Sequence, residues 1–302
     1  MAQQLFTENR VRGRFRRLKK TEFTPYCALN CGRLTLDEGA QKYEVALKTY
    51  RWNPNGATKA KAKERTFKEV MALSRLKAHP HRNVNTFRGV IFATVEEVGA
   101  RVAPIDSVPS IVTDWVPFGS IEYTTRIKFQ LRLDIIVQLA SGLAHLHGLG
   151  VVHGDIKPNN FRITSSGVVK IIDLGLSRCQ DPYPEDVGYT TTYPSFHFIA
   201  PELIVSKAGC ERMAVTKPTD VYAWSMTALQ ILDGRGEQSL PFAGVSDSRD
   251  VMREVLQGRW PTPAEYPGVE SQAAWGILKR CWTPEPTPRP TIQRTLRDLD
   301  AL

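Results

Sequence analysis

The sequence predicts an α+β protein with a sheet-rich N-terminal half and a helical C-terminal half. Residues 22–36 and 42–50 are strand-like, and the second run ends in alternating apolar side chains with β-branched character. From Leu131 to His147 the apolar residues recur at helical spacing instead. With 302 residues and 42% hydrophobic content, the chain is long enough for one large domain or two closely packed lobes.

The remaining elements follow from the same two periodicities. Apolar residues spaced three or four apart, from Phe67 to Leu76, predict an amphipathic helix that stops before His79-Pro80. Short β-rich runs at Phe87–Phe92 and Ser110–Thr113 predict two further strands. Further helices are expected over 218–232, 249–257, 270–281 and 290–300.

The strongest chemical signal is a cluster of polar residues in the middle of the chain. Residues 153–160 read His-Gly-Asp-Ile-Lys-Pro-Asn-Asn, and residues 173–175 read Asp-Leu-Gly. Two acids, a lysine and an amide therefore fall within about twenty residues. Phosphoryl transfer needs this combination, because one carboxylate takes a hydroxyl proton while a carboxylate and an amide hold magnesium on the phosphates.

This segment resembles the catalytic loop and metal-binding turn of protein kinases. The resemblance implies that Asp155 accepts the substrate hydroxyl proton and that Lys157 neutralises the transferred γ-phosphoryl group. It implies that Asn160 and Asp173 hold Mg²⁺, a cation that prefers oxygen ligands. Lys157 is similar to the residue found in the serine/threonine type of loop.

Upstream motifs are similar to the nucleotide-binding residues of the same family. Val45–Lys48 resembles the Val-Ala-Ile-Lys of kinase strand three, and the helix after it would supply Glu69 as the partner of Lys48. A lysine near phosphates needs such a carboxylate to stay in place and charged.

The strand ending near residue 116 resembles the hinge of the family. Thr113 would limit the depth of the nucleotide pocket, and Asp114 to Val116 would offer backbone groups to the adenine edge.

Four downstream residues resemble the structural supports of the large lobe. Glu202, in Ala-Pro-Glu, is expected to pair with Arg289. Asp220 matches the aspartate that ties down the catalytic-loop backbone, and Ser195 matches a residue that bridges the catalytic acid and lysine. Cys281-Trp282 resembles the tyrosine-kinase-like group.

The glycine-rich phosphate loop departs from the family pattern. Counting back from Lys48 puts Gly32 at the last glycine, and Cys27 and Leu29 at the first two. Glycines there let the backbone approach the phosphates closely, so side chains at these positions put nucleotide affinity in question.

Gly154 is the second departure, because the family has an arginine there that gathers phosphate on the activation loop. We therefore expect activity not to depend on phosphorylation within residues 190–193, which read Thr-Thr-Thr-Tyr.

Charge and cysteine content restrict the possible partners and the cellular compartment of the protein. The formal net charge is +9, and residues 1–20 contribute seven basic side chains against one acidic one. Such a segment is expected to be a disordered tail, with nucleic acid or anionic lipid as alternative partners. Five scattered cysteines do not make a disulfide framework and favour the cytoplasm or the nucleus. No apolar run is long enough for a transmembrane helix.

The resemblance thus implies a two-lobed protein kinase fold, with a small antiparallel β-sheet lobe carrying one helix and a larger, mainly helical lobe. We expect a basic tail at 1–21, the small lobe at 22–116 and the large lobe at 117–302. The implied activity is ATP- and Mg²⁺-dependent phosphorylation of serine or threonine in a protein substrate. Two alternatives stay open: a pseudokinase acting as a nucleotide-binding or scaffold module, and phosphorylation of a small molecule.

Overall fold

The computed structural model forms two compact units. The first contains Met1–His81 and Asn85–Val116, and the second contains Arg82–Val84 and Pro117–Leu302. The residues that the structure describes are 1–19, 22–23, 27–37, 41–51, 59–92, 108–179, 196–205, 215–242, 244–245 and 247–302.

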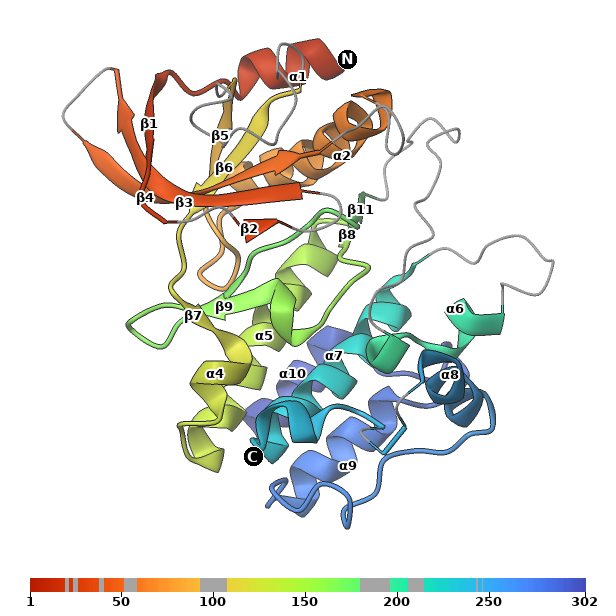
Figure 1. Ribbon diagram of the computed structural model, residues 1–302. Helices are drawn as coiled ribbons and strands as arrows, with labels where there is room; N and C mark the ends of the chain where they lie inside the picture. The colour runs from red at the N-terminus through yellow and green to blue at the C-terminus, as the bar shows by residue number, and fades with distance from the viewer. Residues whose placement is uncertain are drawn as a thin grey trace. The chain divides into compact units, whose positions relative to one another are not determined.

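The first unit is built on an antiparallel sheet (Figure 1). The strands follow the order β1-β3-β4-β6-β5, and β2 also pairs with β3. Their bounds are Gly13–Arg17 (β1), Glu22–Phe23 (β2), Cys27–Leu36 (β3), Lys42–Tyr50 (β4), Phe87–Ile91 (β5) and Ser110–Asp114 (β6). The predicted strands in this part of the chain are therefore confirmed.

The expectation of a disordered tail over 1–21 is wrong for the described residues 1–19. Residues Ala2–Glu8 form helix α1, and β1 pairs with β3 over its whole length. Phe6 and Phe15 are only 4% and 6% exposed, so each anchors its element in the core. The count of positive charges conceals these two apolar anchors, which is why composition alone predicted disorder.

The interior of the sheet depends on close packing around Gly32. Phe15 belongs to the buried cluster there, and an ideal Cβ on Gly32 would overlap the Phe15 ring. Glycine is thus the residue that lets β1 lie flat across β3. The cluster consists of Phe15, Ala28, Leu34, Val45, Leu47, Ile91 and Val112.

The long helix of the first unit is α2 (Lys59–Ala78), which contacts β4, β5 and β6. It begins earlier than its apolar spacing predicted, because the preceding Lys59–Glu64 stretch consists of strong helix formers. One face carries the buried Val70, Leu73 and Leu76, and Glu69 lies among them at 2% exposure.

The second unit is mainly helical and is centred on α7 (Lys217–Asp233). Every residue of α7 from Thr219 to Asp233 is buried, so this helix forms the middle of the core. A capping box of Thr216 and Thr219 begins it, and Gly234 ends it in the left-handed conformation. The other helices are α4 (Ser120–Thr124), α5 (Phe129–Gly148), α6 (Pro201–Val205), α8 (Ser248–Leu256), α9 (Gln272–Cys281) and α10 (Ile292–Asp300).

Short strands frame the segment that carries the polar cluster. β9 (Phe161–Ile163) lies between β7 (Phe118–Gly119) and β10 (Val169–Ile171). β8 (Val151–Val152) pairs with β11 (Arg178–Cys179). The loop from residue 153 to residue 160 is therefore fixed by a strand at each end.

We predict that Gly32→Ala destabilises the protein by about 1–3 kcal/mol, the usual cost of overpacking a filled core. Besides the Phe15 ring, the new Cβ would lie 2.6 Å from the Arg16 carbonyl oxygen. Urea unfolding measures the change. Gly276→Ala is the control, since no atom outside its own helix lies within 4 Å of its Cβ position. Equal stability of the two variants would contradict the packing argument.

Candidate active site

In the first unit, Lys48 and Glu69 form a buried ion pair. Lys48 Nζ lies 3.0 Å from Glu69 Oε1 and 2.9 Å from Oε2. The Tyr50 hydroxyl donates a 2.8 Å hydrogen bond to Oε2. Lys48 and Tyr50 are two residues apart on β4, so both side chains leave the strand on the same face. The predicted pairing of Lys48 with Glu69 is therefore present, and Tyr50 is a partner that the sequence did not indicate.

Thr113 lies on the same face of the sheet as Lys48. It is directly opposite Ala46, and Lys48 follows Ala46 by two residues on β4. β6 ends at Asp114, and Trp115 and the buried Val116 follow it; these three are the residues expected to offer backbone groups to a base.

The Asp114 backbone has a side-chain partner that the sequence did not suggest. Asn85 Nδ2 donates a 2.9 Å hydrogen bond to the Asp114 carbonyl oxygen, and Asn85 itself is 7% exposed. The Asp114 carboxylate pairs with Arg88 through two bonds of 2.6 and 3.1 Å. Neither Asn85 nor Arg88 stands in a recognisable motif, so only the fold could reveal them.

The position of Gly32 does not fit its expected role in a phosphate loop. Gly32 is opposite Val45 on β4, whereas Leu29 is opposite Lys48. Because neighbouring side chains on a strand alternate, Gly32 lies on the other face from Lys48. Cys27 is opposite Tyr50, on the Lys48 face. The residues of β3 nearest to Lys48 therefore include no glycine.

In the second unit, Asp155 is fixed through one of its two carboxylate oxygens. Lys157 Nζ and Asn160 Nδ2 each lie 2.7 Å from Asp155 Oδ2. Asn160 Nδ2 also donates to the Asp155 carbonyl oxygen at 2.7 Å. Within the described residues, Oδ1 has no such partner, and the side chain is 20% exposed. This arrangement orients the carboxylate and leaves one oxygen for a proton donor.

Asn160 and Asp173 are brought together by a backbone hydrogen bond. The Ile172 N–H donates to the Asn160 carbonyl oxygen at 3.0 Å, which places the next residue, Asp173, beside Asn160. Because the amide nitrogen of Asn160 faces Asp155, its amide oxygen is directed elsewhere. An amide oxygen and a carboxylate suit Mg²⁺, so this donor set fits the metal that the sequence implied.

Asp220 fixes the backbone of the 153–160 loop through hydrogen bonds. It is 1% exposed and accepts the His153 N–H at 2.7 Å and the Gly154 N–H at 2.8 Å. His147 Nε2 lies 2.9 Å from the same carboxylate. The predicted tie between Asp220 and the loop is confirmed, and His147 joins it from the end of α5.

Gly154 adopts a backbone conformation that favours glycine. Its φ is +79°, and a Cβ there would lie 2.8 Å from the Leu176 carbonyl oxygen. Glycine is therefore the residue that adopts this backbone conformation without strain.

His153 is buried and neutral. Burial lowers the pKa of its imidazole below the ordinary value, although Asp220, Asp155 and Asp173 act in the opposite direction. Its Nδ1 accepts the Asp155 N–H at 3.2 Å, which requires that nitrogen to be unprotonated. The neutral ring thus helps to position Asp155.

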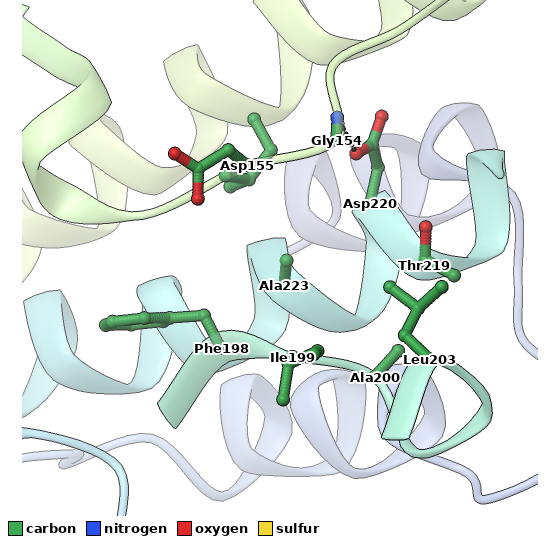
Figure 2. A pocket seen from close by; sticks show the side chains of 10 residues that line it. Gly154, Asp155, Phe198, Ile199, Ala200, Leu203, Thr219, Asp220 and Ala223 are labelled. Carbon is green, nitrogen blue, oxygen red and sulfur yellow. Dashed lines mark hydrogen bonds between the residues drawn. The ribbon is translucent and has the colours of Figure 1, made fainter. Parts of the chain in front are cut away.

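A hollow of about 390 Å³, counting the solvent at its mouth, opens beside Asp155. Its walls include Phe198, Ile199 and Leu203, and Figure 2 shows Phe198 and Ile199 across from Asp155. Polar and apolar groups line it together.

The segment that forms this wall is anchored by a second buried ion pair. The two guanidinium nitrogens of Arg289 lie 2.6 and 2.8 Å from the two oxygens of Glu202, and the Arg289 side chain is fully buried. The predicted pairing of Glu202 with Arg289 is confirmed. Ser195 and residues 190–193 lie outside the described residues.

Comparison with known proteins gives a family match over most of the chain. Residues 35–299 match the model of the protein kinase domain. The chain is 26% identical to serine/threonine-protein kinase 12 of Arabidopsis thaliana over 251 residues, which cover 79% of this chain and 48% of that protein. It is 27% identical to the serine/threonine/tyrosine-protein kinase HT1 of the same plant over 250 residues, covering 80% and 56%.

A third relative is the mouse non-receptor tyrosine-protein kinase TNK1, 27% identical over 270 residues that cover 86% of this chain and 36% of that protein. The chain spans about half the length of the two plant relatives.

We predict that Gly154→Ala destabilises the protein by ~1–2 kcal/mol, the cost of placing an L-residue in the left-handed region. Gly154→Arg should cost at least as much, since it adds the same Cβ. Chemical denaturation checks both variants. Gly148→Ala is the control, because its Cβ position has no neighbour within 4 Å. If Gly154→Ala is as stable as the control, the conformational argument fails.

Protonation of His153 should destabilise the fold at acid pH. The unfolded imidazole takes a proton near pH 6.5, whereas the folded one takes it only at lower pH. The free energy of unfolding should therefore fall as the pH drops below about 6.5, by at most ~1.4 kcal/mol per pH unit from this group. In His153→Asn, which keeps an acceptor for the Asp155 N–H, the fall between pH 7.5 and pH 5 should be smaller. Identical slopes in both proteins would contradict this assignment.

Proposed function

Because the chain belongs to the protein kinase family, we propose that it transfers the γ-phosphoryl group of ATP to serine or threonine hydroxyls of a protein substrate. The observation that carries this proposal is the state of Asp155. One carboxylate oxygen is held by Lys157 and Asn160, while the other has no partner among the described residues. A carboxylate oriented in this way is suited to receive a hydroxyl proton.

Asp155 and Lys157 have complementary roles in the proposed reaction. The substrate hydroxyl lies against Asp155 Oδ1, which steers it and accepts its proton as the new O–P bond forms. Lys157 carries a positive charge 2.7 Å from the other carboxylate oxygen, so it is placed to offset charge on the transferred phosphoryl group.

Lys48 binds the non-transferred phosphates in this proposal, and Glu69 keeps its ammonium group oriented and charged. Thr113 limits the depth of the base site, and the backbone from Asp114 to Val116 meets the adenine edge. Gly32 has no part in nucleotide binding, because its strand position faces away from Lys48.

Asn160 and Asp173 would hold Mg²⁺ through their side-chain oxygens. When bound, the ion would neutralise charge on the phosphates of the nucleotide. The chain's own contribution is to keep the two donors adjacent through the hydrogen bond from Ile172 to Asn160.

A protein substrate is favoured over a small molecule by the hollow beside Asp155. Its wall, at Phe198–Leu203, is fixed to the core by the Glu202–Arg289 pair, and such a fixed wall suits the docking of a peptide. Serine or threonine is favoured as acceptor because the names of the two plant relatives include serine/threonine kinase and Lys157 stands in the loop. A binding module without turnover is not favoured, because Asp155 and Lys157 are paired in the loop and Lys48 and Glu69 are paired in the first unit.

An intracellular setting, in the cytoplasm or the nucleus, is the proposed location, on the grounds of cysteine content. In the described part of the chain, no helix combines the length and apolarity that a membrane crossing requires.

The decisive variant is Asp155→Asn. Phosphoryl transfer to a mixed Ser/Thr peptide library should fall by about 10²–10⁴-fold, the usual contribution of a general base, while Mg-ATP binding is kept. Radiolabelled phosphate transfer and calorimetric titration measure the two properties. Asp134→Asn, at an exposed position of α5, is the matched control and should behave as wild type.

Nucleotide binding without any transfer that depends on Asp155 would favour the binding module instead. Transfer to small hydroxyl compounds but to no peptide would remove the proposed substrate class.

A further inference from the structure

The N-terminal segment is ordered although it lies outside the family match. The match begins at residue 35, yet residues 1–19 are folded as part of the first unit. The segment contributes a helix, a strand and the link between them. Its role therefore has to be read from its own contacts.

The link between α1 and β1 lies along the edge strand β5. The Val90 N–H donates to the Asn9 carbonyl oxygen at 2.8 Å, and the Val11 N–H donates to the Val90 carbonyl oxygen at 2.9 Å. Gly89 makes this approach feasible, because any Cβ there would overlap the Asn9 carbonyl oxygen and Val11. The start of the chain is thus held by backbone hydrogen bonds on both sides of Arg10.

The helix itself packs on α2. Residues of α1 and α2 lie in contact, and Figure 1 shows α1 beside α2 in the first unit. Phe6 is the buried residue of α1, at 4% exposure, whereas Gln3 and Gln4 on the same helix are exposed. Phe6 is therefore the most deeply buried side chain of α1, with Ala2 and Leu5 half-buried on the same helix.

We infer that α1 is a brace that holds α2 in the position where Glu69 meets Lys48, with Phe6 as its anchor. Phe6 is a positioning residue that acts through Glu69 and touches no substrate. This inference rests on the proposed function for its effect on activity, while its structural part concerns α2 alone.

The position of α2 affects the ion pair because the buried carboxylate of Glu69 needs its partners on β4. This carboxylate is 2% exposed and has Lys48 and Tyr50 as partners on β4. A shift of α2 away from the sheet would separate the carboxylate from both, and a buried charge that loses its partner is strongly disfavoured. The sheet contacts α2 through β4, β5 and β6, and α1 adds a contact from a further element. The link that follows α1, at Asn9 and Val11, is hydrogen-bonded to β5.

The test compares Phe6→Ala with Phe6→Leu and with Gln3→Ala, an exposed change on the same helix. We expect kcat/KM for ATP to fall at least five-fold in Phe6→Ala, with partial recovery in Phe6→Leu and no change in Gln3→Ala. Thermal unfolding establishes that each variant is folded at the assay temperature. If Phe6→Ala is not folded, Phe6→Leu against Gln3→Ala decides the question. Wild-type kcat/KM in a folded Phe6 variant would overturn the inference.

A double-mutant cycle distinguishes an effect of Phe6 through the Glu69–Lys48 pair from a general destabilisation of the first unit. In the Glu69→Gln background, Phe6→Ala should cause less than a two-fold further loss, because the ion pair through which it acts is already gone. An equal fold-loss in both backgrounds would overturn the inference.

Hydrogen exchange keeps this inference distinct from the proposed function. The amides of α2 should exchange faster in Phe6→Ala than in Gln3→Ala, and no nucleotide is needed to observe it. If the wild-type protein transfers no phosphate, the proposed function fails, and exchange over residues 59–78 still tests the brace. Unchanged protection of α2 in Phe6→Ala would overturn it.

Discussion

The arrangement of the second unit depends on the hydrogen bonds that the buried carboxylate of Asp220 accepts. This carboxylate sits on α7, the helix whose residues from Thr219 to Asp233 are all buried, and it accepts two successive backbone N–H groups of the loop. His147 satisfies it from α5. Two core helices thus converge on one carboxylate. Because a buried charge without partners is costly, α5, α7 and the loop have to assemble together, and the position of Asp155 follows from that assembly.

The first unit uses the same principle with a different purpose. Glu69 is as deeply buried as Asp220, but its partners are a lysine and a tyrosine on a neighbouring strand. Asp220 ties a backbone in place, whereas Glu69 ties one side chain to another. A movement of α2 alone would therefore separate Glu69 from Lys48. Displacing the loop that contains Asp155 would instead require disruption of the core of the second unit. In the proposed active site, the Lys48–Glu69 pair can therefore be adjusted by a helix movement, whereas the position of Asp155 is fixed.

The sequence predicted the elements and groups whose spacing is set by chemistry. Asp155, Asn160 and Asp173 are close in sequence, so their motif can be recognised from the sequence alone. Glu202 and Arg289 were found because each stands in a recognisable local motif. Partners chosen by the fold were missed: Asn85 and His147 carry no local signature. Strand register was also missed, because counting residues back from Lys48 does not show that Gly32 lies opposite Val45 and Leu29 opposite Lys48. The N-terminal segment was misread because two phenylalanines outweigh seven basic residues once they are buried.

The route of residues 9–17 also bears on which edges of the described sheet can pair with another strand. Free strand edges expose backbone groups that pair readily with another chain. Asn9–Val11 cover the β5 end of the strand order, and among the described residues β1 forms the other end. Along β1 the exposed side chains Arg14 and Arg16 alternate with the buried Phe15, and Arg16 lies opposite Arg33 of β3. A second copy that paired with this edge in the same way would bring like charges opposite one another, which disfavours such pairing.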